Sequence, residues 1–302
     1  MFISFGYDIS LRLEVETAVL FCLRIHPSRC KDLVSGENFR IEPQRPFEEY
    51  SDGYGNRCGR VHCKPGIIRF VNRGVIRDSG DLDVFAPRAP QEEIFRLPSD
   101  TLVYLLPSRY CETDSELANF AWANFSATPP GWARVQQICD FVHGHIQFDY
   151  MKARANRTAL EAFRERVGVC RDFTHLAITL CRCMNMPARY VTGYLGDIGI
   201  PPAPYPMDFS AWMEVYLGGR WFAFDPRNNC RRIGRIVIAR GRDASDVALT
   251  SVFGNHTLAE FFVVTEEVSE NHAFRAAENS QNGTDPENQF RGDILTRAVA
   301  AR

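Results

Sequence analysis

The sequence has 302 residues, enough for one large domain or two ordinary ones, and 45% are hydrophobic while 24% are charged, as in soluble globular proteins. A formal net charge of −2 and a pI near 6.4 provide none of the positive field that nucleic acids and anionic membranes attract. We therefore expect no nucleic acid and no membrane as partner, and a peptide or protein substrate instead.

The apolar run AVLFCL at residues 18–23 is closely flanked by charges, and no small-residue cleavage site follows it. With neither an export signal nor an anchor in view, we expect a cytoplasmic protein whose ten cysteines are reduced thiols. Cys58, His62 and Cys63 could supply soft metal ligands, but a strand would send the two cysteines to opposite faces. We therefore expect no metal and no other cofactor.

The first part of the chain has the patterns of strands. Apolar residues alternate from Ile9 to Ile25, which predicts one long strand or two in sequence. The turn-forming stretch SDGYGN follows at 51–56, and GIIRFVNRGVIRD at 66–78 has the composition of further strand. We expect residues 1–95 to form an antiparallel β-domain, and three prolines within 86–100 to mark its connection to the next part.

Helical patterns follow this connection. TDSELANFAWANF at 113–125 begins with a threonine cap, and GWARVQQICDFVHGHI at 131–146 places apolar residues three and four apart. We assign residues 96–268, connection included, to a second domain. Residues 269–302 are poor in apolar residues and are expected to form a disordered tail.

The stretch GVCRDFTHLAITLCRCMNMP at 168–187 predicts a buried helix that begins at Cys170, with Asp172 in its first turn. Backbone N–H groups at a helix N-terminus stabilise a thiolate, so we expect a lowered pKa for Cys170 and take it as a candidate nucleophile. The alternative is a tight, buried helix entry without chemistry. Cys181 and Cys183 lie inside the same helix, where thiols are expected to act as packing residues.

The stretch SAWMEVYLGGRWFAFDP at 210–226 predicts a β-hairpin with Gly218–Gly219 as its turn. This turn sets Leu217 opposite Arg220. One face of the hairpin is then wholly apolar and is expected in the hydrophobic core; it carries Ala211, Met213, Val215, Leu217, Phe222 and Phe224.

The other face of the hairpin raises a question of chemistry. Ser210 and Asp225 are diagonal neighbours on it, with Cα atoms expected about 7 to 8 Å apart. A histidine at 210 would reach Asp225 with one ring nitrogen and offer the other to Cys170, which would complete a Cys–His–Asp triad. The sequence has serine at that position.

These two stretches, RVGVCRDFTHLAITLCRCMNMPARYVTGYL and AWMEVYLGGRWFAFDP, resemble the core of the transglutaminase-like superfamily over residues 160–230. This superfamily of papain-like cysteine enzymes includes transglutaminases and bacterial peptidases or amidases, and some bacterial members have a β-domain in front of the core. The resemblance implies an α+β fold: an N-terminal antiparallel β-domain, then a papain-like core whose nucleophile helix packs on an antiparallel sheet. It makes Cys170 the nucleophile and Asp225 the group that orients a histidine, whose place is taken by Ser210.

Serine cannot replace that histidine, because its hydroxyl stays protonated near neutral pH. The serine at position 210 then has three possible explanations. It is an introduced substitution, or it is a natural loss that leaves a pseudoenzyme. In the third, the Cys170 thiolate still forms an acyl-enzyme slowly without a base. His175 lies about 140° round the helix from Cys170 and is expected to point away. The other histidines that could substitute are His143, His145 and His256.

The expected function is that of a transglutaminase-like cysteine hydrolase, a peptidase or amidase that forms a thioester on Cys170 and is impaired by Ser210. The alternatives are a non-catalytic peptide-binding protein and an amine-transferring transglutaminase. Trp212 and Tyr194 are candidate substrate contacts. Arg227, opposite Ser210 in the hairpin register, either faces the cleft and attracts acidic substrate groups or belongs to a solvated, arginine-rich strand.

Overall fold

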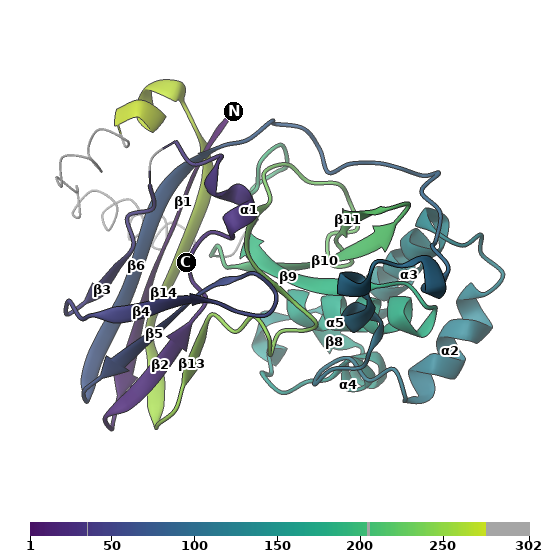
Figure 1. Cartoon of the computed structure of the whole chain (residues 1–302), viewed down its shortest axis with the longest axis horizontal. Helices are drawn as coiled ribbons and strands as arrows, with labels where there is room; N and C mark the ends of the chain where they lie inside the picture. The colour runs from purple at the N-terminus through teal and green to yellow at the C-terminus, as the bar shows by residue number, and fades with distance from the viewer. Residues whose placement is uncertain (35, 204–205, 276–302) are drawn as a thin grey trace.

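The computed structural model describes residues 1–34, 36–203 and 206–275, which form two parts lying side by side (Figure 1). One part is a β-sandwich that contains the N-terminal strand and the last strand of the described chain. The other part, residues 99–241, is an antiparallel sheet covered by helices and is called the helical core below. Within the described ranges, no helix is long and apolar enough to cross a lipid bilayer.

The β-sandwich consists of two four-stranded antiparallel sheets, with strand orders β14–β1–β6–β3 and β13–β2–β5–β4. The rings of Phe21 and Phe70, one from each sheet, meet between them at 5.4 Å. The alternating pattern predicted over residues 9–25 forms parts of two successive strands, with a break at 14–16. The elements are β1 (Phe2–Leu13), β2 (Thr17–Phe21), α1 (Pro27–Cys30), β3 (Arg40–Glu42), β4 (Phe47–Ser51), β5 (Arg57–Cys63), β6 (Gly66–Arg77), β13 (Thr250–Val252) and β14 (His256–Val268).

The end of the described chain returns to the β-sandwich. β14 pairs along the length of β1, and β13 pairs with β2. The sequence analysis ended the β-domain at residue 95 and placed residues up to 268 in the second domain, whereas these two strands lie in the sheets of the first. The pairing satisfies backbone groups of β1 that would otherwise form an open sheet edge.

The predicted tail begins differently from the expectation. Residues 270–275 are helical, Ala273 is buried, and the ring of Phe274 lies 6.1 Å from that of Phe2. The rest of the predicted tail, residues 276–302, lies outside the described residues.

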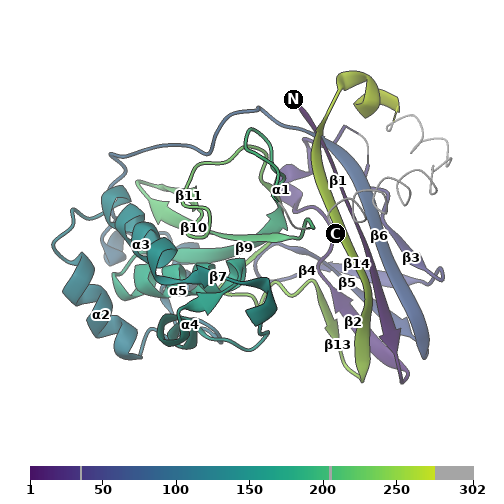
Figure 2. The same ribbon diagram turned by 180° about the vertical axis from the view of Figure 1, so that it is seen from behind.

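The helical core has a four-stranded antiparallel sheet in the order β11–β10–β9–β12. Helix α5 packs on β10 and β9, and α2, α3 and α4 surround α5, as the view from behind shows (Figure 2). A 3-10 helix, η1 (Ile94–Arg96), lies in the segment between the two parts. The elements of the helical core are η2 (Ser99–Leu105), α2 (Glu116–Phe125), α3 (Trp132–His145), β7 (Gln147–Phe148), η3 (Tyr150–Lys152), α4 (Ala159–Glu165), β8 (Val167–Gly168), α5 (Cys170–Cys183), β9 (Ala188–Tyr194), β10 (Ser210–Leu217), β11 (Arg220–Phe224) and β12 (Ile236–Gly241).

The sequence patterns of the helical core correspond closely to these elements. α5 begins at Cys170 as predicted, while α2 is capped by the Ser115 hydroxyl rather than by a threonine. The predicted hairpin is confirmed, because Leu217 pairs with Arg220. Its two turn glycines have φ values of 54° and 83°, the left-handed conformation that a two-residue hairpin turn requires.

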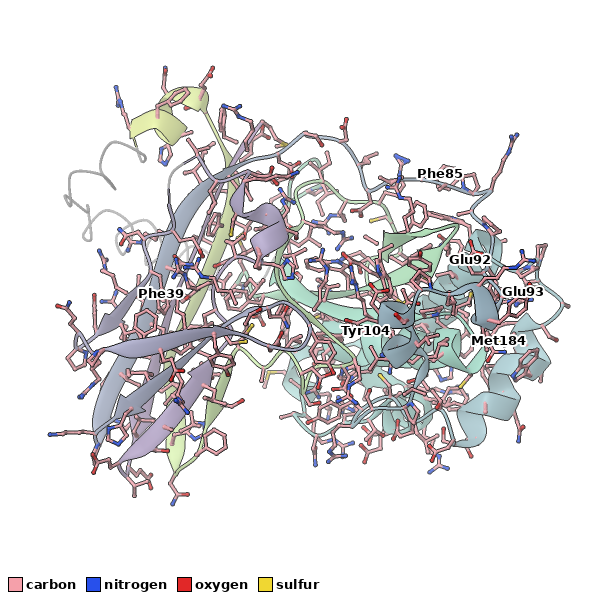
Figure 3. All side chains as sticks on the ribbon, in the orientation of Figure 1. Phe39, Phe85, Glu92, Glu93, Tyr104 and Met184 are labelled. Carbon is pink, nitrogen blue, oxygen red and sulfur yellow. The ribbon has the colours of Figure 1, made fainter. Side chains whose placement is uncertain are left out.

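The two parts are joined by side chains as well as by the connecting segment, residues 78–98. Tyr104, labelled in Figure 3, lies between the Tyr54 ring of the β-sandwich at 6.2 Å and the Trp221 ring of β11 at 5.3 Å. Asn56 forms two hydrogen bonds with the backbone of Arg240 in β12, at 2.7 and 2.8 Å. These contacts fix the β-sandwich against the outer face of the hairpin sheet.

Candidate active site

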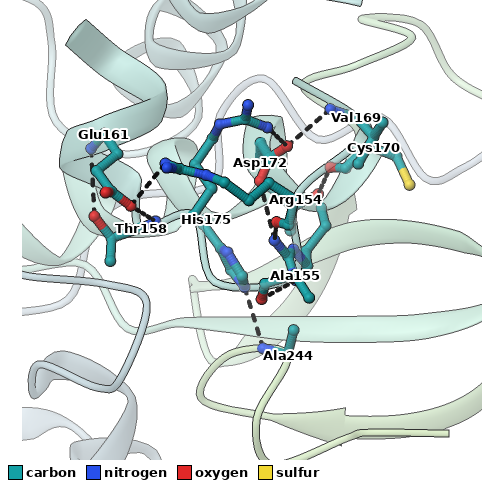
Figure 4. Close-up of polar contacts among 12 residues, drawn as sticks. Arg154, Ala155, Thr158, Glu161, Val169, Cys170, Asp172, His175 and Ala244 are labelled. Atoms are coloured by element: carbon teal, nitrogen blue, oxygen red, sulfur yellow. Dashed lines mark hydrogen bonds and ion pairs between the residues drawn. The ribbon is translucent and has the colours of Figure 1, made fainter. Parts of the chain in front are cut away.

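The start of helix α5 is held by a buried cluster of charges. The Asp172 carboxylate accepts hydrogen bonds from the Val169 backbone N–H and from the Arg157 guanidinium, both at 2.9 Å. Arg157 is only 4% exposed, so this pair ties the first turn of α5 to the loop before α4. Figure 4 shows that the Cys170 side chain points away from this cluster. The cluster therefore fixes the helix start and leaves the thiol to face another side.

The thiol faces the beginning of β10. Helix α5 packs against β10, and the backbone N–H of Ala211 and the charge of Arg227 lower the pKa of the Cys170 thiol, while the charges of Asp208 and Asp225 raise it. Cys170 itself is partly exposed and packs against the hydrophobic core. The start of α5 and the segment around position 210, which the sequence analysis placed in one candidate site, therefore belong to elements that pack together.

The predicted activation of Cys170 is wrong in this structure. Burial raises the pKa of the thiol to about 11, and the Asp208 carboxylate acts in the same direction. The Ala211 N–H and the charge of Arg227 lower the pKa, but they do not compensate for the lost hydration of a thiolate. The thiol is thus protonated near neutral pH, so nucleophilic attack requires a proton acceptor.

Asp225 has a partner other than a histidine. Its Oδ2 accepts from Arg235 Nη2 at 3.0 Å and from Asn228 Nδ2 at 2.8 Å, while Oδ1 accepts from the Asn228 backbone N–H at 2.9 Å. Arg235 also donates to both oxygens of Asp83 in the connecting segment. Asp225 and Arg235 are 6% and 8% exposed. The carboxylate predicted to orient a histidine is therefore part of a buried ion cluster.

The two aromatic residues predicted as substrate contacts are buried. Tyr194 is fully buried and its ring lies 5.2 Å from that of Phe5 in β1. Trp212 is 1% exposed and lies beneath the Arg235 guanidinium, 5.0 Å from ring centre to charge. A side chain with almost no exposed surface cannot contact a substrate, so both residues serve as packing residues in this structure. The sequence missed this because it cannot show that the β-sandwich and the connecting segment cover the second face of the hairpin.

Arg227 lies in the turn after β11 rather than in an extended solvated strand. Its guanidinium stands over the Phe148 ring at 4.1 Å, and its charge acts on both Cys170 and Asp208. Its backbone carbonyl is bound by the ring of His143 at 2.8 Å. Of the two interpretations of Arg227, its proximity to the thiol favours the one that faces the site.

The histidines have other contacts. His175 is fully buried between the Tyr110 and Tyr190 rings, its Nε2 accepts from the Ala244 N–H at 3.1 Å, and burial lowers its pKa to about 3. It points away from the Cys170 thiol, as expected (Figure 4).

Of the three other histidines considered above, two bind backbone carbonyls and one lies in the β-sandwich. His145 binds the Phe163 carbonyl at 2.7 Å, and His256 lies on the β-sandwich in β14. His143 binds Arg227. Among the described residues, no histidine is one of the main influences on the pKa of the Cys170 thiol.

Cys58, His62 and Cys63 do not converge on one point. The two cysteines are buried in the β-sandwich, while the His62 ring points outward to Glu16 at 3.4 Å. In the part of the chain that the structure describes, no three His, Cys, Asp or Glu side chains gather as a metal site would need.

A cavity of about 150 Å³ lies beside Asp225, between the connecting segment, α3 and the end of β11. Asp83 and Asp225 line it and Cys170 does not. The cavity therefore touches the buried ion cluster rather than the thiol.

The sequence analysis missed two residues, one whose charge acts on the thiol and one that pairs with Asp225. Asp208 lies two positions before Ser210, and an acidic residue so close to a candidate site was a usable signal. Arg235 lies in an arginine-rich stretch in which nothing distinguishes it from its neighbours, so its pairing with Asp225 needed the tertiary structure.

Comparison with known proteins places this geometry in a wider context. Residues 121–226 match the sequence profile of the transglutaminase-like superfamily. An uncharacterized protein of Mycobacterium leprae is 32% identical over 113 residues, which cover 36% of this chain and 40% of that protein. One of Mycobacterium tuberculosis is 38% identical over 96 residues, which cover 29% of this chain and 31% of that protein. The chain thus matches less than half of the length of these relatives.

A solved structure matches nearly the whole chain. It is the crystal structure of a candidate cysteine protease from Cytophaga hutchinsonii, with a TM-score of 0.77 and 28% sequence identity. The match covers 89% of this chain and 91% of that chain, so it includes the β-sandwich as well as the helical core.

Proposed function

We propose, from the premise that residues 121–226 belong to the transglutaminase-like superfamily, that this chain is a cysteine hydrolase which cleaves peptide or carboxamide bonds through a thioester on Cys170. The observation that carries the proposal is the position of Cys170. Cys170 is the first residue of α5, and α5 packs on β10, the element that would bear the base in a triad. The likeness to a candidate cysteine protease supports the same class of reaction.

The expected reaction has two stages. The Cys170 sulfur attacks the substrate carbonyl carbon, the S–C bond forms, and the amine leaves with a proton. Water then attacks the thioester, which releases the acid and restores the thiol. As the first residue of α5, Cys170 has a backbone N–H outside the helical hydrogen-bond ladder, and this N–H can donate to the oxyanion.

The reaction is expected to be slow. The thiol is protonated near neutral pH because burial raises its pKa to about 11, and Asp225 is bound by Arg235 and Asn228. Ser210 offers no nitrogen base. The same observations favour the second candidate, a peptide-binding protein that has lost catalysis.

The experiment that separates the two candidates uses a panel of peptide anilides and activated esters. The chain, its Cys170→Ala variant and a Cys230→Ala control, which removes an exposed thiol, are assayed for product and for acyl-enzyme by mass spectrometry. A hydrolase gives product and an acyl adduct on residue 170 in the first and third proteins only. If all three proteins are equally inert while peptides still bind, the binding protein is the correct reading. Product that appears only with an added amine would identify a transferase.

A further inference from the structure

Two buried cysteines face each other across neighbouring strands of the β-sandwich. The sulfur atoms of Cys22 and Cys58 lie 4.0 Å apart and share a hydrogen bond, and the two residues are 4% and 9% exposed. We propose that these two cysteines are a redox modification site, which a peroxide converts to a disulfide bond at the interface between the β-sandwich and the helical core. This inference goes beyond the proposed function, because it involves neither Cys170 nor its substrate.

The strand register brings the two cysteines together. β2 and β5 are antiparallel, and the last residues that they pair are Phe21 and Gly59. Cys22 follows Phe21 and Cys58 precedes Gly59, so the same register sets the two cysteines opposite each other. Opposite residues of an antiparallel pair have Cα atoms about 4.5 to 5.5 Å apart, and a disulfide joins Cα atoms about 4.4 to 6.8 Å apart. The backbone therefore has the spacing of a disulfide, and rotation of the side chains is enough to bring the sulfurs together.

Both thiols point to the outer face of their sheet. The Phe21 ring points into the β-sandwich, where it meets the Phe70 ring of the other sheet at 5.4 Å. Successive side chains of a strand point to opposite faces, so Cys22 points outward, and Cys58 lies opposite it on the same face. On an uncovered sheet, both thiols would be open to solvent.

The helical core covers this end of the sheet. Farther along the same face of β5 the His62 side chain is exposed, whereas Cys58 is buried. Two residues before Cys58, the Asn56 side chain forms its two hydrogen bonds with the backbone of Arg240 in β12. A bond between Cys22 and Cys58 therefore ties the end of β2 to the strand whose preceding turn is fastened to the helical core.

The two thiols differ in acidity. The hydrogen bond with Cys22 lowers the pKa of the Cys58 thiol, while burial and the Asp52 carboxylate oppose this shift. The same hydrogen bond, together with burial, raises the pKa of the Cys22 thiol well above its ordinary value. Because the thiolate is the reactive form, Cys58 is the sulfur that attacks an oxidant and Cys22 is the thiol that completes the disulfide.

The oxidation balances in two steps. The Cys58 thiolate attacks one oxygen of hydrogen peroxide, the O–O bond breaks, and a sulfenic acid and a hydroxide ion form. The Cys22 sulfur then attacks the sulfenic sulfur, and the OH group leaves with the Cys22 proton as water. The hydroxide ion takes up the proton that Cys58 released. Two thiols and one peroxide thus give one disulfide and two molecules of water, with sulfur oxidised and oxygen reduced.

Peptide mapping tests the bond directly. The reduced, folded full-length chain is treated with hydrogen peroxide, its remaining thiols are blocked with iodoacetamide in urea, and it is digested with trypsin without reductant. Trypsin places Cys22 in the peptide of residues 13–24 and Cys58 in that of residues 58–60. We expect mass spectrometry to find these two peptides joined, two hydrogen masses below their sum, and dithiothreitol to separate them.

Single substitutions separate the two roles. In Cys22→Ala the sulfenic acid of Cys58 has no thiol to react with, so dimedone should label residue 58. In Cys58→Ala the Cys22 thiol should stay reduced. Cys63→Ala removes another buried thiol from β5, one that lies opposite Thr17, and should leave the joined peptides as they are in the unmodified chain.

The exposed thiol of Cys230 shows in every sample whether the peroxide has acted. If Cys230 is oxidised while Cys22 and Cys58 remain reduced, or if they pair with other cysteines, the inference is overturned. In concentrated urea the ten cysteines have many partners, so the joined peptides should be a minor product. An equal yield in urea would also overturn the inference, because the folded register would not be the cause. None of these measurements involves hydrolysis, so they stand or fall separately from the proposed function.

Discussion

Arg235 and Asp225 form a buried ion pair in which Arg235 Nη2 donates to Asp225 Oδ2 at 3.0 Å. Arg235 binds Asp83 at the same time, so one guanidinium joins the end of β11 to the connecting segment. The aspartate that the family resemblance assigns to a catalytic histidine therefore has a structural partner. Its two charged groups are shielded from water, which makes the pair sensitive to the loss of either member.

Replacing Arg235 should destabilise the protein strongly. Arg235→Met leaves Asp225 and Asp83 as uncompensated buried charges, and we expect the free energy of unfolding to fall by about 3–5 kcal/mol. Urea unfolding followed by circular dichroism measures this change. Arg231→Met, which alters an exposed arginine on the same loop, serves as the control and should change stability by no more than about 0.5 kcal/mol. Equal effects of the two substitutions would refute the structural role of the pair.

Introducing a histidine at position 210 should activate the Cys170 thiol. In Ser210→His the imidazole is placed at the start of β10, the strand that packs against α5, where it can accept the thiol proton of Cys170. We expect alkylation at pH 7.5 and hydrolysis of a peptide anilide to rise about 10-fold or more, although Asp225 remains bound to Arg235. Mass spectrometry of the alkylated Cys170 peptide over pH 6–11 checks this, with Ser210→Ala as the control. An unchanged pH profile would mean that position 210 does not reach the thiol.

The charges of Arg227 and Asp208 should shift the pKa of the Cys170 thiol in opposite directions. The charge of Arg227 lowers the pKa of Cys170, so Arg227→Ala raises that pKa and slows alkylation at pH 8. The same variant should lose any preference for peptides with acidic side chains. Arg220→Ala, at the exposed turn of the hairpin, is the matched control and leaves both measurements unchanged. A faster alkylation of Arg227→Ala would show that its charge does not act on the thiol.

Acid should destabilise the folded state through half-buried His26 and fully buried His175. Burial lowers the pKa of His26 to about 4 and that of His175 to about 3, from ordinary values near 6.5. The unfolded chain therefore binds more protons below pH 6.5, and stability falls as the pH drops from about 6.5 to about 4, and further to about 3 for His175.

Urea midpoints at pH 7, 5.5 and 4.5 measure this dependence. His26→Gln removes one of the two groups and should make the loss between pH 7 and 4.5 smaller. His62→Gln changes an exposed ring and should leave the slope as it is. A slope that is the same in all three proteins would contradict the assignment to His26.

Gly193 in β9 should not tolerate a side chain. A Cβ atom there would lie 2.1 Å from the Ile236 carbonyl oxygen and 2.9 Å from the Trp212 ring, and both are held by the sheet. We expect Gly193→Ala to cost more than about 2 kcal/mol of stability, because the strands would have to separate. Gly144→Ala in α3 meets nothing within 4 Å and should stabilise the protein by up to about 1 kcal/mol. Thermal unfolding of both variants gives the comparison.

Local patterns in the sequence determined the elements that carry the site. The start of α5 at Cys170 followed from an acidic first turn and one apolar stripe, and the hairpin register followed from Gly218–Gly219. Helix ends and two-residue turns depend on neighbours within a few positions, so a single sequence contains the information needed to place them.

The tertiary structure alone decided the environment of these elements. β14 pairs with β1 although about 250 residues separate them, and Arg235 rather than a histidine meets Asp225. Neither partnership has a local signal, because both arise when distant segments pack together. The same packing reverses the expected pKa of Cys170: a helix start favours the thiolate, but the burial of the sulfur beside Asp208 depends on the whole fold and outweighs it.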